Sequence, residues 1–224
     1  MIKSFKQALT RIGARTSPQR ITQLRATLNY MMIGRWMEDR GYRFDSRVPH
    51  RTQVWDKMLE IAGGDRVLYL EFGVYTGIAT RYWSQGLTNP DSVLHGFDSF
   101  TGLPDEAGPW EEGQFDIGGA MPKIDDPRVR FFKGWFDETL PTYEAPAHDR
   151  LILNMDADLY SSTACVFSNI GRLVRPGTLI YFDEMNHVDH EPKAFDEFAR
   201  GSGRRFRPLA ADRTLAFVAF ECIG

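Results

Sequence analysis

Several apolar runs in this 224-residue chain end in acidic residues, whose carboxylates can bind cations and hydroxyl groups. Glu71 follows VLYL, Asp98 follows VLHGF, Asp156 follows LILNM, and the pair Asp183-Glu184 follows TLIYF. Strands that alternate with helices form a mainly parallel sheet, and ligands bind such sheets at the carboxyl ends of the strands. We therefore expect these five carboxylates to surround one site.

The segment EFGVYTG at residues 71–77 predicts a turn that holds a ligand against the backbone. Gly73 and Gly77 permit a tight turn, and the following helix offers its N-terminal amides to an anion. Glu71 is placed to bind a cation, and Asp98 to bind ribose hydroxyls. An amino-acid zwitterion joined to a ribose indicates S-adenosylmethionine. A dinucleotide is disfavoured, because the turn lacks the central glycine of the GxGxxG pattern.

A second group of acids predicts a metal site. Asp156 ends one strand, and Asp183 and Glu184 end the next, so three carboxylates can converge. Oxygen-only ligands suit Mg²⁺, which could lower the pKa of a substrate hydroxyl and orient it. The alternative interpretation is that Asp158 and Asp183 cap the helices that follow them.

Five motifs in order give the chain a family resemblance: LEFGVYTG, GFDSFTGLP, FFKGWFDETLP, MDADLYSST and FDEMN. From about residue 65 to residue 200 the sequence resembles class I S-adenosylmethionine-dependent methyltransferases, specifically the macrocin-type O-methyltransferases that act on sugar hydroxyls of natural products. The resemblance implies an α/β, Rossmann-like methyltransferase fold: a mainly parallel seven-stranded sheet with an antiparallel final strand, plus N-terminal helices. The chain departs from the family at Asp183-Glu184-Met185, where Asp-Asp-Tyr is usual.

The resemblance also implies which residues form the site. By this resemblance, the adenine of S-adenosylmethionine is bordered by Gly134, Trp135 and Phe136. The expected cofactor-binding residues are Glu71, Phe72, Gly73, Tyr75, Thr76, Gly77, Asp98, Ser99, Gly134, Trp135, Phe136 and Asp156. The expected metal ligands are Asp156, Asp183 and Glu184.

We expect a metal-dependent O-methyltransferase that moves a methyl group from S-adenosylmethionine to a hydroxyl of a small molecule, a sugar or glycosylated natural product. Asp156 is the first candidate for the catalytic base, and His187 the second, with His190 beside it. Trp110, Phe115 and Tyr160 are candidates for the walls of the acceptor pocket. The alternatives are a divalent-metal glycosyltransferase that uses Asp156-Ala157-Asp158, and a catechol-type O-methyltransferase.

Charge divides the chain into two parts. Residues 1–51 carry a net charge of +8 and the remainder −11. We expect residues 1–50 to form a basic helical arm with a role as a lid or in oligomerisation, and residues 51–224 to form the S-adenosylmethionine-binding domain. Such an arm could bind nucleic acid, but its arginines are dispersed, so docking on the acidic body or in a homodimer is preferred.

No stretch approaches the roughly 20 apolar residues of a membrane span, and no signal peptide is recognisable. Cys165 and Cys222 are expected as free thiols, so the protein is expected in the cytoplasm.

Alternating patterns of apolar and polar residues predict the strands and helices of the domain. Residues 101–127 are expected to form a long functional loop. The expected strands are 67–73, 92–97, 129–134, 151–155, 178–182, 205–209 and 214–222, and the expected helices are 52–62, 77–86, 161–174 and 190–200.

Overall fold

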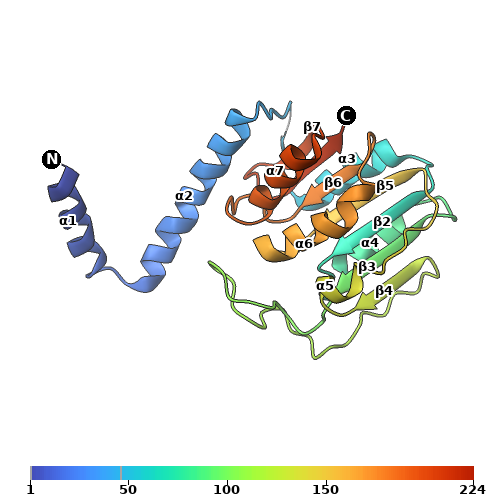
Figure 1. The fold of residues 1–224 in the computed structure, drawn as a ribbon, viewed down its shortest axis with the longest axis horizontal. Helices are drawn as coiled ribbons and strands as arrows, with labels where there is room; N and C mark the ends of the chain where they lie inside the picture. The colour runs from blue at the N-terminus through green and yellow to red at the C-terminus, as the bar shows by residue number, and fades with distance from the viewer. Residues whose placement is uncertain (1, 46) are drawn as a thin grey trace.

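The computed structural model describes residues 2–45 and 47–224, and an open sheet covered by helices forms the body of the protein (Figure 1). The strands are β1 (Arg47–Val48), β2 (Val67–Phe72), β3 (Val93–Asp98), β4 (Val129–Lys133), β5 (Arg150–Met155), β6 (Leu179–Phe182), β7 (Phe206–Asp212) and β8 (Val218–Cys222). The helices are α1 (Ile2–Gly13), α2 (Pro18–Asp39), α3 (Arg51–Ala62), α4 (Ile78–Gly86), α5 (Phe136–Thr139), α6 (Tyr160–Ile170), the 3₁₀ turn η1 (Gly171–Leu173) and α7 (Glu191–Ser202).

The strands follow the order β1-β7-β8-β6-β5-β2-β3-β4. β2 lies between β3 and β5 and is parallel to both, whereas β8 is antiparallel to β6 and β7. The predicted α/β fold, with a mainly parallel sheet and an antiparallel final strand, is confirmed. The structure adds an eighth strand to the predicted seven. This strand, β1, has two residues that pair with β7, and two residues are too few to give an alternating pattern.

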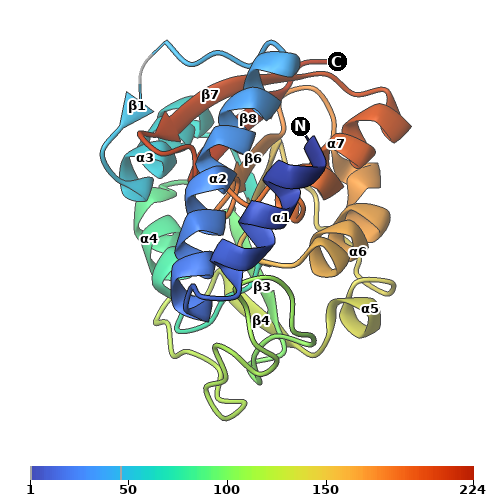
Figure 2. The ribbon, with the colours of Figure 1, turned by 90° about the vertical axis from the view of Figure 1, so that its left-hand side faces the viewer.

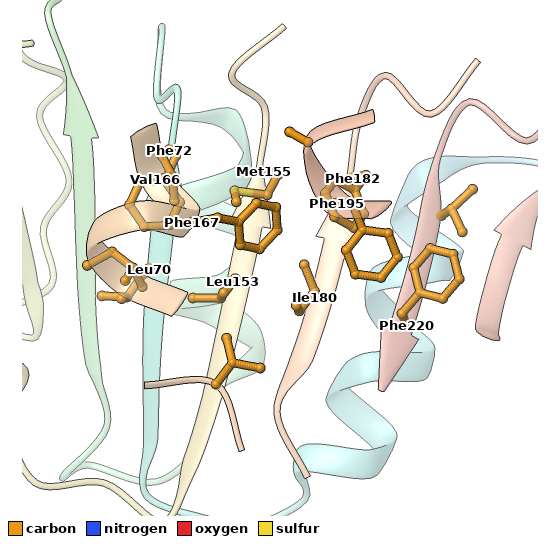
Figure 3. Close-up of a cluster of buried hydrophobic side chains, with 14 of the residues drawn as sticks. Leu70, Phe72, Leu153, Met155, Val166, Phe167, Ile180, Phe182, Phe195 and Phe220 are labelled. Carbon is orange, nitrogen blue, oxygen red and sulfur yellow. The ribbon is translucent and has the colours of Figure 1, made fainter. Parts of the chain in front are cut away.

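Helices cover both faces of the sheet, which explains why its central strands are apolar without interruption. All six residues of β2 and all four of β6 are buried. Because side chains alternate across a strand, Leu70 and Phe72 face α6 and α7 on one side, while Tyr69 faces α3 and α4 on the other. Figure 3 shows the first of these layers, in which Phe167 of α6 lies against the sheet.

The helices α1 and α2 extend away from this body and form a V in Figure 1. Ser17 caps α2 by accepting a hydrogen bond from the Arg20 N–H, and Pro18 begins the helix, where no intrahelical N–H bond is lost. The side chains of Ile33 and Met37, in the C-terminal half of α2, are buried against the body. In residues 2–45 and 47–224, no helix is long and apolar enough to cross a membrane.

Candidate functional site

A cavity of about 750 Å³ opens at the carboxyl ends of β2, β3, β5 and β6. Most of the residues predicted from the sequence line it: Glu71, Gly73, Tyr75, Thr76, Asp98, Ser99, Gly134, Trp135, Phe136, Asp156, Asp183 and Glu184. The other site candidates named from the sequence are not part of this lining: Phe72, Gly77, Trp110, Tyr160, His187 and His190. The Phe72 side chain is fully buried in the core, where it stacks on Phe97.

The turn after β2 depends on glycine. Gly73 has a φ of +89°, and a Cβ atom added to it would lie 1.8 Å from the carbonyl oxygen of Asp156 at the end of β5. The Gly73 N–H donates to the carbonyl of Phe97 on β3. Two neighbouring strand ends therefore pass so close to this position that no side chain fits, and the backbone forms the cavity wall there.

Asp98 holds the two loops on either side of it. One of its carboxylate oxygens accepts hydrogen bonds from the N–H groups of Val74 (2.7 Å) and Tyr75 (2.8 Å), and the other accepts one from the Phe100 N–H (2.6 Å). The Ser99 hydroxyl donates to the carbonyl of Gly102. Both residues therefore shape the loops of the site through their side chains, a role that the sequence prediction did not assign to them.

Glu71 is a buried carboxylate in the cavity wall. It accepts hydrogen bonds from the hydroxyls of Thr80 (2.6 Å) and Tyr69 (3.2 Å). Burial raises the pKa of Glu71 to about 8, although both hydroxyl bonds oppose the shift. Thr80 was not predicted, because it comes from the next helix and no local motif marks its contact with Glu71.

The carboxylates at the ends of β5 and β6 form one cluster, as predicted. Burial is the main reason for the raised pKa of Asp156, and the nearby Asp183 and Asp158 raise it further. Burial also raises the pKa of Asp158 to about 7 and that of Glu184 to about 8, with Asp183 adding to both shifts. These groups are close enough to repel one another when they are ionised.

Protein donors already engage one member of the cluster. The Tyr181 hydroxyl donates to Asp183 at 2.5 Å, and a guanidinium nitrogen of Arg51 lies 3.4 Å from each oxygen of the same carboxylate. Arg51 begins α3, lines the cavity and also lies over the ring of Trp55. It is 132 positions from Asp183 in the chain, so no local sequence pattern indicates the pair.

A further buried carboxylate, Glu191, accepts hydrogen bonds from the segments that follow β5 and β6. Its two oxygens accept hydrogen bonds from the backbone N–H groups of Ala157 (3.2 Å) and Glu184 (3.1 Å). Glu191 thus fixes the segments after β5 and β6 relative to each other. The sequence prediction missed this residue, which reads as an ordinary acid in the first turn of α7.

As arranged, the cluster does not have the geometry of a metal centre. No three His, Cys, Asp or Glu side chains within residues 2–45 and 47–224 form a group that could hold a metal ion. Asp183, one of the three predicted ligands, has both oxygens near Arg51 instead.

The two histidines after β6 lie behind the cavity wall. A ring nitrogen of His187 is 3.2 Å from the Asn29 side chain of α2, and its other nitrogen is 3.5 Å from Glu184. Burial lowers the pKa of His187 to about 4, so the ring is neutral at physiological pH. The ring of Trp110 packs against His187 and His190, with centroids 4.6 and 4.8 Å away.

The predicted acceptor-wall aromatics have different environments. Phe115 lines the cavity and packs edge-on against Tyr75. Trp110 is buried against the histidines, and the Tyr160 hydroxyl donates to Glu197 at the surface. Of the three, Phe115 alone has its side chain at the cavity in this structure.

Comparison with known proteins supports the resemblance seen in the sequence. Residues 120–210 match the family described as Macrocin-O-methyltransferase (TylF). Demethyldecarbamoylnovobiocin O-methyltransferase of Streptomyces niveus is 38% identical over 73 residues, which cover 33% of this chain and 27% of that protein. The match thus spans only about a quarter of the relative's length.

Solved structures share the fold. The O-methyltransferase NovP aligns with a TM-score of 0.59 and 21% identity, covering 91% of this chain and all of that one. A calicheamicin methyltransferase aligns with a TM-score of 0.60 and 20% identity, covering 92% of this chain and 93% of that one. Over residues 120–210 the chain is therefore similar to the macrocin O-methyltransferase family, and as a whole it shares the fold of these solved methyltransferases.

Proposed function

We propose that the protein is an S-adenosylmethionine-dependent O-methyltransferase that methylates a hydroxyl of a sugar or glycosylated natural product. The observation that carries this proposal is the cavity at the strand ends, where a glycine turn without side chains lies beside the buried carboxylate of Glu71. The family match supports methyl transfer over the glycosyltransferase alternative. A catechol-type acceptor remains the alternative substrate class.

The cavity wall suits the two polar ends of S-adenosylmethionine. Glu71 would bind the ammonium group, because a cation beside this buried carboxylate would relieve its unfavourable burial. The backbone at Gly73 would lie along the amino-acid portion, and Asp98 would reach the ribose. The half-exposed ring of Trp135 would border the adenine.

Asp156 is the proposed base. S-adenosylmethionine would supply the methyl group to an acceptor oxygen, which loses its proton as the new bond forms. Burial and neighbouring carboxylates raise the pKa of Asp156, so it holds a proton more firmly than an ordinary aspartate does. Much of the rate would come from holding oxygen and methyl carbon roughly 3–3.5 Å apart. His187 is less suited, because it lies outside the cavity lining and its pKa is lowered.

Magnesium dependence concerns the carboxylates at the ends of β5 and β6. Asp156, Asp183 and Glu184 would be the ligands, but their present arrangement does not fit a metal ion and Arg51 lies against Asp183. Metal binding therefore requires Arg51 to leave that carboxylate. For this reason the proton transfer above is assigned to Asp156 without a metal.

Calorimetric titration with S-adenosylmethionine tests the cofactor site. We expect the wild-type protein to bind it, and Glu71→Gln to weaken binding at least tenfold, because the amide cannot neutralise an ammonium group. The matched control is Glu60→Gln, since Glu60 pairs with Lys57 on the exposed surface of α3. Equal affinity in wild type and Glu71→Gln, or binding of a nucleotide sugar in place of S-adenosylmethionine, would contradict the proposal.

A further inference from the structure

The N-terminal arm, defined as residues 2–39 (α1 and α2), leaves most of its apolar side chains uncovered (Figures 1 and 2). α1 buries none of its residues, although Ile2, Phe5, Leu9 and Ile12 recur at the spacing of one helix face. The same pattern continues on α2, where Met31 is 70% exposed. The body of the protein therefore does not cover the apolar surface of its own arm.

The exposed apolar area is large enough for a stable interface. Ten large apolar side chains of the arm are exposed, each by 44% or more. Together they present on the order of 1,000 Å², whereas the largest apolar patch of a typical monomer is about 300–600 Å² and each partner of a standard interface buries about 800 Å².

Charge indicates what covers this surface. Seven exposed Lys and Arg residues and two acids lie within residues 2–39. The loop formed by residues 103–121, called the rim segment, has the opposite character, with five exposed acids and no Lys or Arg. It also exposes two large apolar side chains, Phe115 (42%) and Met121 (51%). The arm and the rim segment are thus complementary in both charge and apolarity.

We propose that two copies of this chain form a dimer in which the arm of each packs on the rim segment of the other. The arm and the rim segment lie on the same side of the molecule in Figure 1, so a twofold axis can exchange them reciprocally. Packing of two arms on each other would instead bring two basic surfaces together. An anionic membrane is disfavoured as the occupant, because the acidic body, with its net charge of −11, would be repelled.

The dimer would place a partner's arm at the mouth of the cavity. Leu103, Pro104, Asp105 and Phe115 of the rim segment also line the cavity. The arm of the second copy would therefore border the acceptor side of the site. This interface does not depend on methyl transfer, and its test measures mass rather than activity, so the failure of one proposal leaves the other intact.

Analytical ultracentrifugation of the full chain at micromolar concentration tests the proposal. We expect the wild type to sediment as a dimer, and Leu24→Asp/Leu28→Asp to sediment as a monomer, because both side chains are more than half exposed on α2. Ile61→Asp is the control, since Ile61 is an exposed apolar residue on α3, outside the arm. Unchanged circular dichroism would show that the arm variant is folded.

A double variant of the rim segment tests whether this segment, and not another surface, covers the arm. Asp105→Lys/Glu106→Lys should weaken the dimer at least tenfold and reduce its sensitivity to salt, because it removes two charges that would face the basic arm. A monomeric wild type, a dimer that persists in the Leu24/Leu28 variant, or a rim variant with unchanged affinity would overturn the proposal. So would a monomeric wild type that binds vesicles of anionic lipid through the arm.

Discussion

Replacing Gly73 with alanine tests whether the crossing of two strand ends fixes the site. The new Cβ would lie 1.8 Å from the Asp156 carbonyl oxygen and 2.8 Å from its carbonyl carbon, and both are backbone atoms that cannot rotate away. A φ of +89° adds a left-handed strain of about 1–2 kcal/mol, and forced displacement of packed atoms adds about 1–3 kcal/mol. We therefore expect Gly73→Ala to lower the free energy of unfolding by about 2–5 kcal/mol.

Gly203→Ala is the matched control for this prediction. Gly203 ends α7 at a φ of +69°, and an added Cβ would meet no atom within 4 Å. That variant should lose only the backbone term, about 1 kcal/mol. Urea unfolding of both variants gives the two free energies directly. Equal losses would refute the reasoning, because they would mean that the close approach of Asp156 contributes nothing.

Two further predictions concern the buried charges. Arg51→Met should strengthen the binding of Mn²⁺ at least tenfold, because it frees Asp183, and electron paramagnetic resonance measures that binding. The control Arg47→Met, in the surface strand β1, should leave Mn²⁺ binding unchanged. Unchanged or weaker binding in Arg51→Met would show that Arg51 does not compete with a metal. In the ligand-free protein the pKa of Glu71 is raised from 4.5 to about 8, so the folded state binds its proton more tightly than the unfolded chain, and stability should fall as the pH rises from about 5 to 8. Glu71→Gln should flatten that dependence in urea unfolding measured across the window, and an unaltered slope would contradict the raised pKa.

The layout of the body could be predicted because it depends on local patterns. Apolar runs that end in acids located β2, β3, β5 and β6 within one or two residues, and the parallel arrangement then brought Glu71, Asp98, Asp156 and Asp183 to one cavity. Each of these inferences needs only the sequence around one strand and the rule that parallel strands end at the same edge.

The contacts that helix residues make with the strand ends of the site could not be predicted from local patterns. Arg51, Thr80 and Glu191 reach the strand ends from separate helices, and their partners lie 132, 9 and 34 positions away. Nothing in the local pattern distinguishes Arg51 from the other arginines of the basic N-terminal region. The sequence therefore indicated that Asp156, Asp183 and Glu184 lie at one edge of the sheet, but not that Arg51 lies against Asp183.

The three backbone bonds to Asp98 have a consequence for motion. One carboxylate ties the amides of Val74 and Tyr75, in the first loop, to the amide of Phe100, at the entrance to the second. A shift of either loop is therefore transmitted to the other through Asp98, so the two loops should move together. A ligand that binds against one of these loops would therefore also change the position of the other.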